Sequence, residues 1–306
     1  MKTIELGKSG LKVPNIAIGC MRINGARKEK AEQFVDKALE LGANFFDHSD
    51  IYGGGECEKI FADVVHMSPS IREKIILQSK CGIKPGVMFD FSKEHILNSV
   101  DGILKRLKTE YLDILLLHRP DALVEPEEVA EAFDQLEQSG KVRYFGVSNQ
   151  KPMQIKLLQK YLKQSIIANQ LQLSITNANM ISNGLEVNML TDGAVDRDGS
   201  ILDFCRLEDI TIQPWSPFQY GFFEGVFLDN DKFPKLNETV NRIAEKYQVT
   251  NTTIAIAWLL RHPAKMQPVT GTMNRKRLEE ICQASELYLS REEWYEIYLS
   301  AGYILP

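Results

Sequence analysis

Residues 111–118 read YLDILLLH, and this apolar run is the clearest single indication of the fold. Its central ILLL does not alternate polar with apolar side chains, which is typical of a parallel strand that is covered on both faces. An amphipathic helical pattern follows over 126–138. The stretch therefore predicts one strand and its following helix in an α/β protein.

Seven more short apolar runs predict strands, over 16–21, 44–49, 75–80, 143–148, 168–173, 211–215 and 266–270. Helical patterns alternate with them, over 31–39, 96–107, 152–163, 236–247 and 275–283. Eight such units favour a closed (β/α)8 TIM barrel, which we expect to form a single domain over residues 1–306. An open doubly wound sheet is the competing architecture, but its usual Gly-rich turn near the N-terminus is missing.

Other segments fall outside the eightfold pattern. Residues 3–13 predict a β-hairpin that closes the bottom of the barrel. An extra helix is expected over 251–262, and Ser290 with Glu293 predicts a capping box that opens a final helix. The segment 174–210 is long and partly Gly-rich, so we expect a loop that reaches over the active face.

The composition of the 306 residues excludes several classes of protein. Hydrophobic residues make up 44% and charged residues 25%, as in a globular protein with a large core. The formal net charge of -5 gives no basic surface for nucleic acid, and no apolar run is long enough to cross a membrane. Five cysteines without a C-x-x-C pair indicate neither a disulfide framework nor a metal site. We expect a cytoplasmic monomer that acts on a small molecule.

Polar residues gather where the predicted strands end. In a parallel barrel all strands end on the same face, so their terminal side chains converge on one pocket. Tyr52 lies on the loop after one strand, and the strand ends supply Asp47, Lys80, His118, Ser148, Asn149, Gln170 and Trp215. An acid, an ammonium, an imidazole and a phenol together indicate a catalytic site.

This set suits proton delivery to a carbonyl oxygen while a hydride reaches the carbonyl carbon. A free phenol, with a pKa of about 10, is a weak acid at neutral pH, and a neighbouring ammonium lowers that pKa. We expect Lys80 to act on Tyr52 in this way, with Asp47 holding Lys80 charged and oriented. His118 is expected to donate a hydrogen bond to the substrate oxygen. Alone, a buried Asp–Lys pair is as often structural as catalytic, and an isolated histidine is more often structural, so the hypothesis depends on the whole set.

Seven segments in order along nearly the whole chain resemble the aldo-keto reductase superfamily: FFDHSDIYGGGECE, QSKCG, LLLHRPD, GVSN, NQLQLS, QPWSPF and VTGTMNRKRLEEI. The resemblance is to the bacterial-type branch with HRPD and PWSP-like segments. It implies an oxidoreductase that reduces aldehydes or ketones with NADPH, with NADH as the alternative cofactor. It also implies the catalytic set Tyr52, Lys80, Asp47 and His118, with Tyr52 as general acid.

The resemblance further implies a cofactor lying across the barrel mouth. Ser148, Asn149 and Gln170 would contact the nicotinamide carboxamide, and the ring would stack on Trp215. The implied pyrophosphate and adenosine contacts are Ser216, Pro217, Gly221, Thr272, Met273, Asn274, Arg277 and Glu280. Many family members have a phosphate-binding Lys where Gly271 stands, so the 2′-phosphate is expected to contact Arg277 with Thr272 and Asn274.

Two other functions remain open from the sequence. The potassium-channel β subunits of the same superfamily suggest a redox sensor that binds NADPH tightly and has negligible turnover. A barrel glycosidase with Asp47 as one of two carboxylates is the third hypothesis, although no second acid ends a strand. Loss of nicotinamide absorbance with a panel of aldehydes separates an enzyme from a sensor. Substrate specificity is expected to lie in the loops 21–27, 174–206 and 218–227.

Overall fold

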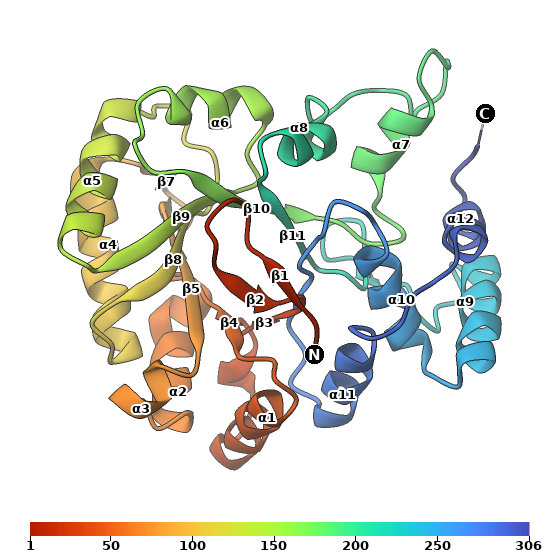
Figure 1. Cartoon of the computed structure of the whole chain (residues 1–306), viewed down its shortest axis with the longest axis horizontal. Coiled ribbons are helices and arrows are strands. Elements are labelled where there is room, and N and C mark those ends of the chain that lie inside the picture. The colour runs from red at the N-terminus through yellow and green to blue at the C-terminus, as the bar shows by residue number, and fades with distance from the viewer. Residues whose placement is uncertain (306) are drawn as a thin grey trace.

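Eight parallel strands close into a barrel in the computed structural model, which describes residues 1–305 (Figure 1). Every strand lies at a run that the sequence predicts as a strand. In order around the ring they are β3 (Ala17–Gly19), β4 (Phe45–Asp47), β5 (Ile76–Cys81), β8 (Leu112–Leu117), β9 (Val142–Ser148), β10 (Ile166–Gln172), β11 (Thr211–Trp215) and β14 (Val269–Thr270). The predicted (β/α)8 barrel is therefore confirmed.

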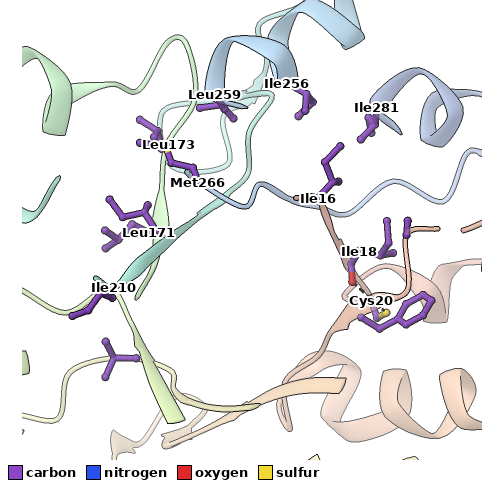
Figure 2. Packing of buried hydrophobic residues seen from close by; sticks show 14 of the residues in the cluster. Ile16, Ile18, Cys20, Leu171, Leu173, Ile210, Ile256, Leu259, Met266 and Ile281 are labelled. Atoms are coloured by element: carbon purple, nitrogen blue, oxygen red, sulfur yellow. Dashed lines mark hydrogen bonds between the residues drawn. The ribbon is translucent and has the colours of Figure 1, made fainter. Parts of the chain in front are cut away.

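Helices surround the barrel. In chain order they are α1 (Lys28–Glu40), α2 (Glu56–Val64), α3 (Pro69–Arg72), α4 (Lys93–Leu107), α5 (Pro126–Gln138), α6 (Pro152–Gln159), α7 (Asn179–Leu185), α8 (Ile201–Leu207), α9 (Pro234–Tyr247), α10 (Asn251–Leu260), α11 (Arg275–Gln283) and α12 (Arg291–Ser300). Figure 2 shows Ile16, just before β3, pointing out of the ring toward Ile256 of α10 and Ile281 of α11. All three side chains are fully buried. Burying each such side chain stabilises the fold by about 1.5–3 kcal/mol.

The N-terminal hairpin closes the bottom of the barrel, as the sequence predicts. β1 (Thr3–Glu5) pairs antiparallel with β2 (Lys12–Pro14), and Leu6 and Val13 are buried among the barrel side chains. Figure 1 shows the hairpin across the centre of the ring of strands. Gly7 is required at its turn, because φ is +56° and a Cβ there would approach a barrel carbonyl oxygen to 2.5 Å. The opposite end of the barrel is left open for ligands.

Short elements surround the carboxyl ends of the strands. A 3-10 turn follows β3 (η1, Ile23–Gly25), and another follows β4 (η2, Tyr52–Gly55). The remaining strands form two small hairpins after β5 and β11, namely β6 (Ile83–Lys84) with β7 (Met88–Phe89), and β12 (Gln219–Tyr220) with β13 (Gly225–Val226). These segments wall the mouth of the barrel.

The segment 174–210 differs from its expected form. It contains α7 and α8 where a loop is expected, and α8 buries Ile201 and Phe204. It packs beside the last helix, where Ser182 Oγ and Tyr298 Oη lie 2.8 Å apart, and it does not reach over the active face. Each helix is only 7 residues long, and a polar stretch separates them. Their apolar periodicity is therefore too short to identify from the sequence.

Other predictions for the C-terminal part are confirmed. α10 forms the extra helix, and Ser290 opens α12 with a capping box. Ser290 Oγ accepts from the amide of Glu293 at 3.2 Å, and the amide of Ser290 donates to Glu293 Oε2 at 2.8 Å.

The five cysteines are buried free thiols. Within residues 1–305, no helix has both the length and the apolar character needed to span a membrane.

Candidate active site

A cavity of about 990 Å³ opens at the carboxyl ends of the barrel strands. Most of the predicted site residues meet there, although they come from distant parts of the chain. Those that line it are Asp47, Tyr52, His118, Ser148, Asn149, Gln170, Trp215, Ser216, Pro217, Thr272, Met273, Asn274 and Arg277. Lys80 lies behind the wall, where it is fully buried.

Two predicted cofactor contacts, Gly221 and Glu280, do not line this cavity, and their contacts with a cofactor stay predictions. The carbonyl of Gly221 accepts from Nε2 of Gln172 at 2.6 Å, so this part of its hairpin faces β10. Glu280 lies about one helical turn beyond Arg277 on α11, further from the helix start. Its carbonyl accepts from Thr253 Oγ1 of α10 at 2.8 Å.

Lys80 is the centre of a chain of polar contacts beneath the cavity. Its Nζ lies 2.8 Å from each carboxylate oxygen of Asp47 and 2.6 Å from the carbonyl oxygen of His48. On the cavity side, the same Nζ lies 3.2 Å from Tyr52 Oη. Because the ammonium is fully buried, these oxygens replace the water that would otherwise surround it. The phenol, ammonium and carboxylate are thus in contact.

A left-handed turn places Tyr52 at the cavity wall. The next three residues, 53–55, are glycines with φ of +57°, +64° and +90°, which other residues rarely adopt. The turn leads into α2, where buried Glu58 accepts from Nε of Arg106 and from Oγ of Ser79, each at 2.7 Å. Glu58 therefore ties the segment that carries the phenol to α4 and β5.

Burial dominates the pKa of the phenol. It raises the pKa of Tyr52 above the ordinary 10.0, and the charge of Lys80 offsets only part of this effect. This corrects the expectation that Lys80 brings the pKa of the phenol below its ordinary value. Burial also acts to lower the pKa of Lys80, but the attraction of Asp47 and Tyr52 outweighs it and raises that pKa. At neutral pH the phenol keeps its proton and the amine keeps its charge.

The imidazole of His118 is neutral at neutral pH. Burial, together with the charges of Lys80 and Arg119, lowers its pKa well below 6.5. Its Nδ1 lies 3.0 Å from Ser49 Oγ, and its ring stands edge-on to that of Tyr52, with centroids 6.1 Å apart. Within residues 1–305, Nε2 of His118 has no hydrogen-bond partner, so it is free to bind a ligand in the cavity.

Amides from across the barrel hold Asp47. Its Oδ1 accepts from Nε2 of Gln78 at 2.7 Å and from Nε2 of Gln170 at 3.1 Å. Gln213 joins the two, because its Oε1 accepts from Gln78 at 2.9 Å and from Gln170 at 3.3 Å. Nε2 of Gln213 then donates to Gln267 at 2.8 Å. This buried network orients the carboxylate with both oxygens toward the ammonium.

The wall next to this network carries the groups expected to bind a carboxamide. Ser148 Oγ donates to the carbonyl of Gln170 at 3.0 Å, and Nδ2 of Asn149 donates to Ser148 Oγ at 2.7 Å. Nε1 of Trp215 donates to Asn149 Oδ1 at 3.1 Å, which fixes the indole. Nε2 of Gln170 is taken by its buried neighbours, but its Oε1 has no partner within residues 1–305. That free acceptor fits the NH₂ group of a nicotinamide carboxamide.

The other end of the cavity suits an anion. Asn274 caps α11, and its Oδ1 accepts from the amide of Arg277 at 3.1 Å. Arg22, on the loop after β3, donates from Nη1 to the carbonyl of Gly271 at 3.1 Å. Both arginines line the cavity. Two guanidinium groups beside a helix N-terminus fit the phosphates of a dinucleotide.

Sequence reasoning missed four of these residues. Gln78 and Gln213 each stand inside a barrel strand, two residues before a residue predicted for the site. Because strand side chains alternate, that spacing puts both glutamines on the inner face and could have identified them. Arg22 and Arg119 lie on loops, where no periodicity marks them.

Comparisons with known proteins identify the family of the chain. The sequence matches the Aldo/keto reductase family over residues 15–298. It is 35% identical over 320 residues to the uncharacterized oxidoreductase YcsN of Bacillus subtilis, covering 100% of both chains. It is 32% identical over 311 residues to a 6-dehydroglucose reductase of Novosphingobium aromaticivorans, covering 99% of this chain and 96% of the relative.

Solved structures share the fold. A thermostable aldo-keto reductase in complex with the inhibitor epalrestat is 25% identical and superposes with a TM-score of 0.80, covering 98% of this chain and 100% of that one. A Bombyx mori aldo-keto reductase in complex with NADP is 20% identical, with a TM-score of 0.75 and coverage of 98% and 92%. The chain therefore belongs to the aldo/keto reductase family and is an NAD(P)H-dependent oxidoreductase.

Proposed function

We propose that the protein reduces an aldehyde or a ketone to the corresponding alcohol with NADPH, and that Tyr52 supplies the proton. The observation that carries the proposal is the 3.2 Å contact between Tyr52 Oη, at the cavity wall, and the buried Nζ of Lys80. A phenol in this position can reach a substrate. The ammonium behind it stabilises the phenolate that remains after proton transfer.

The reaction adds a hydride to the carbonyl carbon and a proton to the carbonyl oxygen. The reduced nicotinamide, when bound, supplies the hydride. Tyr52 donates a hydrogen bond from Oη to the carbonyl oxygen and gives up its proton as negative charge develops there. Lys80 stabilises the resulting phenolate, and Asp47 keeps the ammonium in place. Because burial raises the pKa of Tyr52, the phenol is fully protonated before the reaction begins.

His118 is the second donor to the carbonyl oxygen in this proposal. Ser49 Oγ lies 3.0 Å from Nδ1, and in this proposal it donates to that nitrogen, which places the ring proton on Nε2. A neutral imidazole N–H polarises the carbonyl without giving up its proton. The low pKa of His118 keeps the ring in this form.

NADPH is the preferred cofactor in this proposal because of the groups at the far end of the cavity. Arg277, Thr272 and Asn274 line that end and bind the 2′-phosphate. A guanidinium offers phosphate two parallel N–H donors and an opposite charge, whereas the neutral hydroxyl of NADH gains much less from it. NADH therefore binds at the same place with lower affinity.

Two observations support reduction over the other functions considered. The relative in Novosphingobium is named a reductase. Within residues 1–305, Asp47 and Asp229 are the carboxylates that line the cavity, and Asp47 is held by Lys80. No free pair of carboxylates is therefore present for glycoside hydrolysis.

Loss of NADPH absorbance in the presence of a panel of aldehydes and ketones tests the proposal. Oxidation of NADPH that depends on the added carbonyl compound, with formation of the alcohol, supports it. Tight NADPH binding without turnover of any member of the panel supports a redox sensor and contradicts a reductase. The same assay with NADH measures the cofactor preference.

A further inference from the structure

Three arginines line the cavity, in two different places. Arg22 and Arg277 lie at the end that fits the cofactor phosphates. Arg119 follows His118 directly after β8, and its Cζ lies 6.0 Å from the centroid of the Trp215 ring. Its positive charge therefore lies beside the proposed reaction centre.

Arg119 also differs from the other arginines that are sheltered from solvent. Arg72 donates to Asp113 Oδ2 at 2.6 Å, and Arg106 donates to Glu58 Oε2 at 2.7 Å. Arg119 is half-buried, yet within residues 1–305 its guanidinium has no hydrogen-bond acceptor and no carboxylate within 4.0 Å. Burial lowers its pKa, and no neighbouring acid opposes the shift.

The nearby acid in the sequence, Asp121, is already engaged. Its Oδ2 accepts from the amide of Phe91 at 2.8 Å, and its Oδ1 accepts from the amide of Leu123 at 2.8 Å. A sheltered cation without a counter-charge is unfavourable, and an anion that binds beside it recovers part of that free energy. Within residues 1–305, no carboxylate of the protein pairs with Arg119 and competes with such an anion.

We infer that Arg119 binds a carboxylate on the substrate, so that the preferred substrates are carbonyl compounds that also bear a carboxylate. The inference rests on the proposed reductase function and adds a substrate class to it. With the carbonyl oxygen at Tyr52 and His118, the rest of a small substrate extends along the wall that carries Arg119. Phe223 of the same lining stacks on Trp215, the residue beside Arg119, with ring centroids 5.7 Å apart, so an aromatic substrate also finds an apolar surface there.

Matched substrates that differ only in charge test this inference. We choose 3-formylbenzoate and 4-formylbenzoate, each compared with the corresponding formylbenzamide, because carboxylate and amide have similar shapes. The unaltered protein should have the higher kcat/KM for the benzoates. Arg119→Met should lower kcat/KM for the benzoates by roughly tenfold, as expected for the loss of a hydrogen bond between charged groups, and change that for the benzamides little.

Two further variants sharpen the test. Arg119→Lys keeps the charge but not the planar fork, so it should retain part of the preference for benzoates. Arg206→Met is the control for net charge, since Arg206 lies on α8 outside the cavity and pairs with Asp203. It should leave the ratio of the two kcat/KM values unchanged.

Three results would overturn the inference. One is an equal loss for benzoates and benzamides in Arg119→Met, which would place Arg119 in a general role such as cofactor binding. Another is a fall in kcat/KM for neutral D-glyceraldehyde in Arg119→Met as large as the fall for the benzoates. That result would mean that Arg119 binds hydroxyl groups. The third is an unchanged preference for benzoates.

Binding measurements keep the inference separate from the proposed function. Calorimetry with NADP⁺ present compares the Kd of 4-formylbenzoate and 4-formylbenzamide without turnover. If the protein reduces no aldehyde at all, the proposed function is wrong. The carboxylate-binding role of Arg119 then stands if Arg119→Met weakens binding of the benzoate alone. It fails if binding of the benzoate is unchanged, or if both ligands bind the variant more weakly to the same extent.

Discussion

Nε2 of Gln170 lies 3.1 Å from Oδ1 of Asp47, so a residue of the proposed carboxamide site also contacts the carboxylate that holds Lys80. Gln78 reaches the same oxygen from β5 at 2.7 Å. The amides and the ammonium approach this carboxylate from different strands. The position of the ammonium beneath Tyr52 therefore depends on polar packing inside the barrel as well as on the strand ends.

Replacing Gln78 by Leu is expected to lower kcat while changing the Kd for NADPH little. The change removes a donor from Asp47, so the carboxylate is less firmly oriented toward Lys80. Losing this buried hydrogen bond and leaving its partners unsatisfied should lower the free energy of unfolding by about 1–3 kcal/mol. Urea unfolding and steady-state kinetics measure the two effects.

Gln267→Leu is the matched control for Gln78→Leu. Gln267 belongs to the same network and donates to the carbonyl of Pro14 at 2.7 Å, but it does not contact Asp47. The control should lose stability to a similar extent and keep its kcat. An equal fall in kcat in both variants would mean that the effect of Gln78 on turnover reflects stability and not the position of the carboxylate.

Lys80→Met should abolish turnover and destabilise the fold. Removing the ammonium leaves Asp47 as a buried charge without its counter-ion, which should lower the free energy of unfolding by about 3–5 kcal/mol. Adding Asp47→Asn should restore most of that stability, because a neutral amide needs no counter-ion, without restoring kcat. If the double variant is as unstable as Lys80→Met, the unpaired carboxylate is not the cause.

The pH dependence of kcat/KM for carbonyl reduction follows from two pKa shifts. The pKa of His118 is well below 6.5 and that of Tyr52 is above 10.0. Both groups are therefore neutral between about pH 6 and pH 8, and kcat/KM should be flat there. It should fall in the alkaline range as the phenol loses its proton. A midpoint near the ordinary pKa of histidine that disappears in His118→Gln would contradict the neutral imidazole.

The strand ends were predictable from the sequence because apolar runs and the polar residues that end them are local features. β11 begins at Thr211 and ends at Trp215, as predicted. The spacing of Gln78 and Gln213 places them on the inner face, but which groups they contact was not predictable, since that depends on strand register. Asp47 is paired with Gln78 across β4 and β5, and Gln170 with Gln213 across β10 and β11, only once the barrel has closed.

The direction of the Tyr52 pKa shift departs from the sequence-based expectation for a similar reason. A charge near Tyr52 can be inferred from Lys80 in the sequence, but the opposing effect of burial on the pKa depends on tertiary packing. Local patterns therefore identify which residues can take part, and packing decides what each one contacts.

Tyr52→Phe tests the proton-donor role most directly. Phenylalanine keeps the aromatic ring and removes only Oη, so the Kd for NADPH should change little. Loss of the general acid should slow the chemical step by about 100- to 10,000-fold. Single-turnover measurement of hydride transfer to an aldehyde, with the variant saturated with NADPH, gives that rate. A variant that binds NADPH normally and reduces the aldehyde as fast as the unaltered protein would contradict the assignment of Tyr52 as the proton donor.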